Sequence, residues 1–219
     1  MVLSSEADVM IYTDGSGLEG GIGAAAVLMR HGRTSKTLAY HLGPPTRHTV
    51  YAGEAVGLLL GTELLRQVPG RFRSVAFCTD NQAAIRAAGL YRPGPGRYVL
   101  EWFRDALQLI AKRNGPFTCD IIWTPGHVGI EGNETVDALA KRAARGFTSR
   151  KDLLPRQLRT TPLPDSKAAL QQASLAKLQT RATRHWKSSP RYTRTTKIDP
   201  SLPSKKFLAL TTALSRQQS

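Results

Sequence analysis

The sequence has few cysteines and lacks any long apolar segment. Only Cys78 and Cys119 occur in 219 residues, which excludes a disulfide-stapled secreted scaffold and fits a reducing compartment. The longest apolar run, from Gly21 to Met29, is too short to span a membrane. The first residues, MVLSSEADVM, contain acids and no basic segment, so we expect no secretory signal. These features predict an intracellular protein of the nucleus or cytoplasm.

Acidic residues are also scarce, and the shortage is uneven along the chain. The sequence has 31 Lys and Arg against 16 Asp and Glu, which gives a formal net charge of +15. Residues 1–149 contain 16 basic and 13 acidic side chains, whereas residues 150–219 contain 15 and 3. This excess predicts a polyanionic partner, nucleic acid before membrane. We therefore predict a folded domain, 6–149, and a basic, Pro-containing extension, 150–219, partly helical or disordered, which acts either as a solvated linker or as a phosphate clamp.

Hydrophobic patterning predicts a mixed α/β domain. Apolar runs rich in β-branched and aromatic residues indicate strands, and apolar residues at helical spacing indicate helices. The expected strands are Val9–Asp14, Gly21–Arg30, Thr34–His41, Arg73–Thr79 and Phe117–Trp123. The expected helices are Thr49–Gln67, Asn81–Leu90, Tyr98–Arg113, Asn133–Arg145 and, in the extension, Asp165–Lys187. This order predicts a mixed sheet with helices on its faces.

Two aspartates occupy similar positions at the ends of expected strands. Asp14 ends the first strand before a glycine, and Asp80 follows the fourth strand before an asparagine. An Asp at the end of an apolar strand is costly unless it is hydrogen-bonded or binds a cation. If the two strands are neighbours, the carboxylates face each other and either raise a pKa or recruit a divalent metal. Either Asp taken alone is better explained as a turn residue.

Glu54 is an acid in an otherwise apolar helical stretch. Gly53 and Gly57 flank it, and each costs about 0.5–1 kcal/mol relative to Ala in a helix. Glycine is expected at such positions where another backbone passes close to the helix. The alternative is a single exposed acid on the helix surface.

A glycine-rich loop after the fifth strand carries His127, and Asp137 follows in the next helix. A mobile histidine beside a carboxylate site can move protons near neutral pH. Alternatively, His127 is a surface loop residue, and Asp137 complements the dipole of its helix.

Four motifs follow one another in a specific order. They are T-D-G-S from Thr13, a helical Glu54, T-D-N-Q from Thr79, and W-x-P-G-H-x-G-x-x-G-N-x-x-x-D-x-L-A from Trp123. This order resembles the type 1 ribonuclease H family over roughly residues 6–147, and most closely the RNase H domains of fungal non-LTR retrotransposons. The resemblance implies an RNase H-like α/β fold: a five-stranded mixed sheet, the first three strands antiparallel, with helices on both faces.

The resemblance also implies an activity and the residues that carry it. The implied protein is an endonuclease that hydrolyses the RNA strand of RNA/DNA hybrids with two Mg²⁺ ions about 4 Å apart, which Mn²⁺ can replace. One ion would activate the attacking water and the other would stabilise the leaving 3′ oxygen. The implied metal ligands are Asp14, Glu54, Asp80 and Asp137, and His127 matches a histidine that assists proton movement or product release. The implied nucleic-acid contacts are Ser16, Thr49, Asn81, Gln82 and Asn133.

The resemblance implies partners as well. The RNA/DNA hybrid is the expected substrate, a reverse transcriptase module is a candidate partner, and we expect a monomer. The stretch Leu90–Tyr98 is too short for the basic protrusion of some bacterial members. We therefore hypothesise that the basic extension takes over part of the hybrid binding.

Other functions remain as alternatives. One is a catalytically decayed, transposon-derived module that binds hybrid or RNA. Another is an integrase or exonuclease of the same broad fold, although such enzymes place their acids differently. The sequence Gly15–Gly20 matches G-x-G-x-x-G, the pattern of dinucleotide-binding loops. However, the residues after it favour a strand, and no acid occurs between Gly20 and Arg47. Both observations argue against dinucleotide binding.

Overall fold

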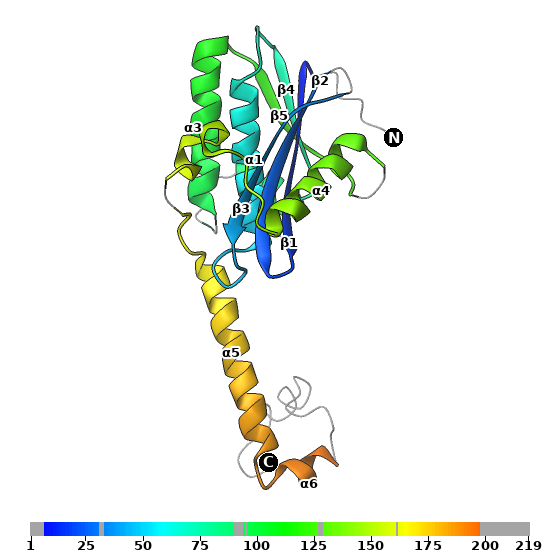
Figure 1. Ribbon diagram of the computed structural model, residues 1–219, viewed down its shortest axis with the longest axis vertical. Coiled ribbons are helices and arrows are strands. Elements are labelled where there is room, and N and C mark those ends of the chain that lie inside the picture. Colours follow the sequence, from blue (N-terminus) through cyan, green and yellow to red (C-terminus); the bar gives the residue numbers. More distant parts are fainter. Residues whose placement is uncertain are drawn as a thin grey trace. The chain divides into compact units, whose positions relative to one another are not determined.

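The computed structural model describes residues 7–30, 33–89, 94, 96–126, 129–160 and 162–197. Contacts divide the chain into two compact units, Met1–Gln172 and Ala173–Ser219. The first unit is built on a five-stranded sheet in the order β3-β2-β1-β4-β5 (Figure 1). The strands are β1 Val9–Leu18, β2 Gly21–Arg30, β3 Arg33–Gly43, β4 Ser74–Thr79 and β5 Thr118–Trp123.

The sheet is mixed, as the sequence predicted. β1 pairs antiparallel with β2, and β2 pairs antiparallel with β3. β4 pairs parallel with β1, and β5 pairs parallel with β4. The chain therefore forms a three-stranded meander first and adds two parallel strands to its β1 edge. This arrangement is the five-stranded mixed sheet, with its first three strands antiparallel, that the resemblance implied.

Helices cover both faces of the sheet (Figure 1). They are α1 Val50–Arg66, α2 Gln82–Gly89, α3 Arg97–Asn114 and α4 Glu131–Ala144. On one face, α1 packs on β1 and β2, α3 packs on α1, and side chains such as Ile11, Leu58 and Phe77 form the larger core. On the other face, Val136 and Ala140 of α4 pack against Tyr12 and Val27. The alternation of side chains along each strand sends successive residues into these two cores.

The first strand is longer than predicted. We expected it to end at Asp14, but the pairing continues through Gly15↔Ala24 and Ser16↔Gly23 to Leu18↔Gly21. The G-x-G-x-x-G stretch therefore lies in the β1–β2 hairpin and does not begin a helix, so the geometry for cradling a dinucleotide is absent at this stretch. As a result, Asp14 lies within β1 rather than at its end.

Residues 150–172 belong to the first compact unit. Two 3-10 helices, Lys151–Leu153 and Arg156–Leu158, form here, and Leu154, Leu158 and Leu163 join the larger core at 4% exposure or less. The segment then reaches the loop between β3 and α1: Asp165 pairs with Arg47 at 2.6 Å, and the Ser166 backbone N–H donates to the Arg47 carbonyl. The beginning of the extension is therefore part of the folded domain.

The second unit contains most of α5, Lys167–Lys187, and all of α6, Tyr192–Thr196. Trp186 and Tyr192 meet edge to face with their ring centroids 6.0 Å apart. Within the part of the chain that the structure describes, no helix combines the length and apolar character needed to cross a membrane.

Candidate metal centre

Parallel pairing of β1 with β4 aligns the two predicted aspartates. The last paired residues are Tyr12 and Cys78, and Asp14 and Asp80 each lie two residues beyond that pair. Because the strands run in the same direction, both acids emerge at the same level of the sheet. The first and fourth strands are therefore neighbours, which was the condition for the two carboxylates to face each other.

Glu54 reaches the same level because α1 lies against β1 and β2 almost backbone to backbone. A Cβ atom on Gly57 would lie 3.1 Å from the Ala25 carbonyl oxygen and 3.2 Å from that of Asp14. A Cβ atom on Gly15 would overlap the Glu54 backbone nitrogen. Only glycine permits this approach, which explains why α1 contains glycine beside Glu54 despite its cost in a helix. The helix consequently buries Glu54 at 4% exposure.

The three carboxylates converge. Asp14, Glu54 and Asp80 each offer an oxygen atom, and these atoms all lie within 4.8 Å of one another. Burial, with the charges of Asp80 and Asp137 adding to it, raises the pKa of Asp14 to about 6. Burial, together with the charge of Asp14, raises the pKa of Glu54 to about 9. A bound cation would relieve both effects, because it favours the charged forms.

One buried oxygen atom of the cluster has no partner among the described residues. Glu54 Oε2 is inaccessible and accepts no hydrogen bond there. The same carboxyl group does receive hydrogen bonds from the Asn81 side chain and the Gly15 backbone, and both oppose the rise of its pKa. A buried oxygen acceptor without a donor, in a set made only of carboxylates, fits a hard divalent cation such as Mg²⁺ or Mn²⁺.

Asp137 stands apart from this three-acid group. It lies on α4, and its Oδ2 accepts a 2.7 Å hydrogen bond from Lys141 Nζ one helical turn later. Its charge nevertheless contributes to raising the pKa of Asp14, so it lies within electrostatic reach of the cluster. The structure thus brings three of the four predicted ligands together and engages the fourth in an ion pair.

The loop after β5 runs beside Asp80. Trp123 Nε1 donates to the Asp80 carbonyl at 3.1 Å, and a Cβ atom on Gly126 would lie 3.0 Å from Asp80 Oδ2. The backbone of Gly126 therefore lies close to the carboxylate, where a side chain would be tight. His127, the predicted proton-transfer residue, lies outside the described residues.

The predicted nucleic-acid contacts lie on several elements of the first unit. Thr49 is the N-cap of α1, where its Oγ1 accepts from the Ala52 backbone N–H. Asn81 Oδ1 accepts from the Ala84 backbone N–H at the start of α2, while its amide contacts Glu54. Ser16 is in β1, Gln82 begins α2 on the surface, and Asn133 is buried at 6% exposure in α4.

Sequence reasoning missed two local partners of the acids. The Gly15 backbone hydrogen-bonds both Asp14 and Glu54, and nothing in the residue type signals this. Lys141, in contrast, lies four residues after Asp137 on one helix, a spacing at which ion pairs form. That pair could have been found from the sequence.

The sequence of the chain is similar to that of a bacterial enzyme. The chain is 28% identical to Ribonuclease H of Neisseria gonorrhoeae over 156 residues, covering 64% of this chain and 97% of that enzyme. A scan against models of protein families gives no match.

Solved structures show the same fold. A foamy viral protease-reverse transcriptase in complex with RNA/DNA hybrid matches 65% of this chain and 20% of its own length, with 18% identity and a TM-score of 0.52. The native prototype foamy virus protein matches 66% of this chain and 22% of its own, at 19% identity and a TM-score of 0.52. This chain thus spans about a fifth of those longer proteins. The chain is thus similar in sequence to a ribonuclease H along nearly all of that enzyme's length, and it shares its fold with part of the two viral proteins.

Proposed function

We propose that the chain is a ribonuclease H that hydrolyses the RNA strand of RNA/DNA hybrids with the help of divalent cations. The observation that carries this proposal is the convergence of Asp14, Glu54 and Asp80 within 4.8 Å around a buried carboxylate oxygen. The match to a bacterial ribonuclease H and the fold shared with a viral protein that binds RNA/DNA hybrid support it.

Asp14, Glu54 and Asp80 would hold two Mg²⁺ or Mn²⁺ ions, with Asp137 as the fourth ligand once it exchanges its bond to Lys141. Bound ions supply Lewis acidity to the phosphodiester and generate a nucleophilic water. Glu54 must lose its proton to act as a ligand, because the pKa of its carboxyl is raised to about 9. Asn81 positions the Glu54 carboxylate, and the bare backbone of Gly126 leaves room beside Asp80.

We infer from the motif order that the domain is of type 1 and derives from a retrotransposon. The foamy viral proteins contain a matching fold within a protease-reverse transcriptase chain, which supports a reverse transcriptase module as a partner. Ser16, Thr49, Gln82 and Asn133 would contact the sugar–phosphate backbone, where the 2′-hydroxyl distinguishes RNA from DNA. His127 would assist proton movement or product release.

A cleavage assay tests the proposal. A hybrid labelled on its RNA strand, an RNA duplex and a DNA duplex are each incubated with the full chain and Mg²⁺ or Mn²⁺. We expect cleavage of the hybrid RNA only, and none after chelation by EDTA. Asp80→Asn should be inactive, whereas Asp105→Asn, which changes an exposed acid on α3, should cleave like the parent. Hybrid binding without metal-dependent cleavage would instead favour the decayed binding module.

A further inference from the structure

Helix α5 displays a row of cations with no acid beside it. Lys177, Arg181 and Arg184 are spaced by four and three residues, which places them on one face of the helix. We call these three residues the α5 cation row. All three are exposed, and none forms an ion pair with any residue that the structure describes. No Asp or Glu occurs from Ser166 to Ile198, so this stretch contains no acid that could neutralise the row.

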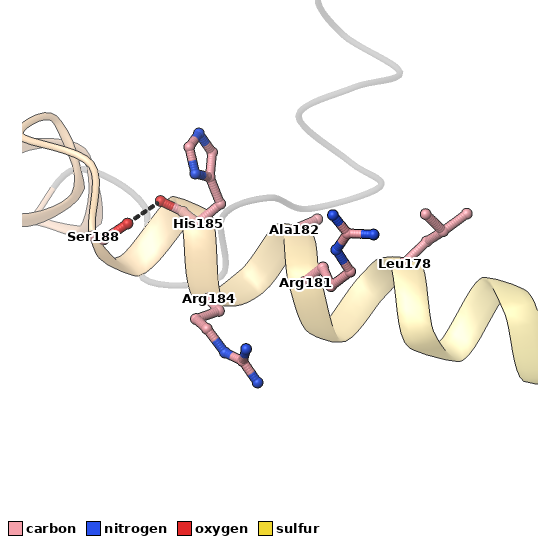
Figure 2. Close-up of a pocket in the computed structure, with 6 residues that line it drawn as sticks. All are labelled: Leu178, Arg181, Ala182, Arg184, His185 and Ser188. Atoms are coloured by element: carbon pink, nitrogen blue, oxygen red, sulfur yellow. Dashed lines mark hydrogen bonds between the residues drawn. The ribbon is translucent and has the colours of Figure 1, made fainter.

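The surface around this row is cationic as well. A pocket of about 500 Å³ on α5 includes two members of the row, and Figure 2 shows Arg184 pointing away from the helix on the side opposite His185. The described residues that line it include no acid; they are Leu178, Arg181, Ala182, Arg184, His185 and Ser188. After α5, Arg191, Arg194 and Lys197 continue the excess of positive charge. An unneutralised cationic surface of this kind attracts a polyanion.

The segment that leads into α5 is held on the domain by buried contacts. Ala169, in the first turn of the helix, is fully buried, and Leu154 is too. The Arg47–Asp165 pair and the Ser166–Arg47 hydrogen bond fix the helix start. Removing the whole extension from Arg150 would therefore open the core, so its function must be tested by substitutions on the exposed face of α5.

We propose that the α5 cation row binds the sugar–phosphate backbone of a nucleic-acid duplex and gives the chain a metal-independent, sequence-independent affinity for its substrate. Phosphates are the ligand that three unpaired cations on one helix face fit best, because each contact releases a counterion from the duplex. Such contacts position a duplex without reading its bases or its sugars. The choice of an RNA/DNA hybrid as the substrate rests on the proposed function, whereas the phosphate contact itself does not.

The test replaces Lys177, Arg181 and Arg184 together by Gln, which keeps a good helix former at each position. Binding of a fluorescent hybrid is measured by anisotropy without divalent cations, at NaCl concentrations from 50 to 200 mM. Each lost phosphate contact should reduce the slope of log affinity against log salt by about 0.9, or about 2.7 for the row. The parent should therefore lose about 40-fold more affinity than the variant over this salt range. A DNA duplex should show the same difference.

A charge-matched control removes three cations elsewhere. Arg71, Lys112 and Arg113 are exposed, and Asn114 bonds Phe72 just before β4, which places them near the start of that strand. Asp80 follows the other end of β4, so these cations lie at the end of the sheet away from the cluster. Their Gln variant should keep most of the parent slope. An unchanged slope in the α5 variant, or an equal loss in the control, would overturn the proposal.

Two further outcomes separate this inference from its alternatives. Leu175 and Leu178 are each 58% exposed on α5 and offer apolar surface on which a second copy of the chain could dock instead. Sedimentation velocity should show a monomer. Nucleic-acid binding by this helix would be refuted by two results together: a dimer that Leu178→Gln dissociates, and a salt slope that the Gln triple variant leaves unchanged. If the chain binds duplexes through the row but never cleaves hybrid, only the proposed catalytic function fails.

Discussion

Binding of a divalent cation at the carboxylate cluster should release a proton from Glu54. The pKa of this buried carboxyl is raised to about 9, mainly by burial, while a metal ligand must be ionised. At pH 7 the group lies about two pH units below its pKa, so ionising it costs about 3 kcal/mol. The apparent affinity for Mg²⁺ or Mn²⁺ at pH 7 should accordingly be about 100-fold weaker than above pH 9.

The pH dependence has two parts. Between about pH 6 and pH 9, one proton leaves on binding, and the affinity should rise about tenfold per pH unit. Below about pH 6 the slope should steepen toward two protons, because the pKa of Asp14 is raised to about 6. Titration calorimetry of Mn²⁺ in buffers of different ionisation enthalpy measures both the affinity and the number of protons released.

Two variants make this measurement decisive. Glu54→Gln should weaken binding and abolish proton release near pH 7.5. Glu63→Gln changes another buried glutamate of the same helix, one that pairs with Arg66 instead, and should leave the titration unchanged. An affinity that varies less than twofold between pH 6.5 and pH 8.5 in the parent would refute the assignment of Glu54 as a ligand that ionises on binding.

The same shift fixes the sign of the stability change in metal-free protein. Because the folded-state pKa of Glu54 lies above its ordinary value of 4.5, the group's contribution to stability is full below pH 4.5 and is lost as the pH rises toward about 9. Urea denaturation in EDTA should show this fall in the parent and not in Glu54→Gln. A parent whose stability relative to that variant rises over the same range would contradict the argument.

Three further predictions follow from individual side chains. Asp80→Asn should lower hybrid cleavage about 100-fold or more, while a thermal melt in EDTA shows an unchanged or higher midpoint because carboxylate repulsion is relieved. Gly57→Ala should destabilise the fold by roughly 1–3 kcal/mol in urea denaturation, because the added methyl group meets two backbone carbonyls. Gly89→Ala is the control: its added methyl group meets nothing within 4 Å and should not destabilise the fold. Leu154→Ala should lower the free energy of unfolding by about 2–5 kcal/mol in the same assay. Leu153 is 41% exposed, so Leu153→Ala should lower it far less. Equal losses would show that residues 150–172 do not belong to the core.

Much of the fold could be predicted because its signals are local. The strand Gly21–Arg30 was expected with the bounds that the structure gives to β2. Helix α1 differs from its expected range by one residue at each end, since Thr49 is its cap. Periodic apolar residues and capping groups act within a few positions along the chain, and a sequence displays them directly.

The missed features depend on pairing across the chain. β1 continues past Asp14 because Gly15 to Leu18 find partners on β2, and glycine-rich residues carry no strand signal of their own. Leu154, Leu158 and Leu163 are isolated apolar residues among prolines and cations, without helical or strand periodicity. Their burial requires a preformed core to receive them.

By itself the sequence determined the element order, the charge asymmetry and the identity of the acids, because each of these is a property of residue type and local spacing. The tertiary structure alone decided that Asp14, Glu54 and Asp80 share one small space while Asp137 bonds Lys141. That outcome depends on the parallel pairing of β1 with β4 and on a helix packed directly on a glycine of β1. These acids are 26 to 66 positions apart in the sequence and meet only through such packing, and no local pattern encodes the distance between them.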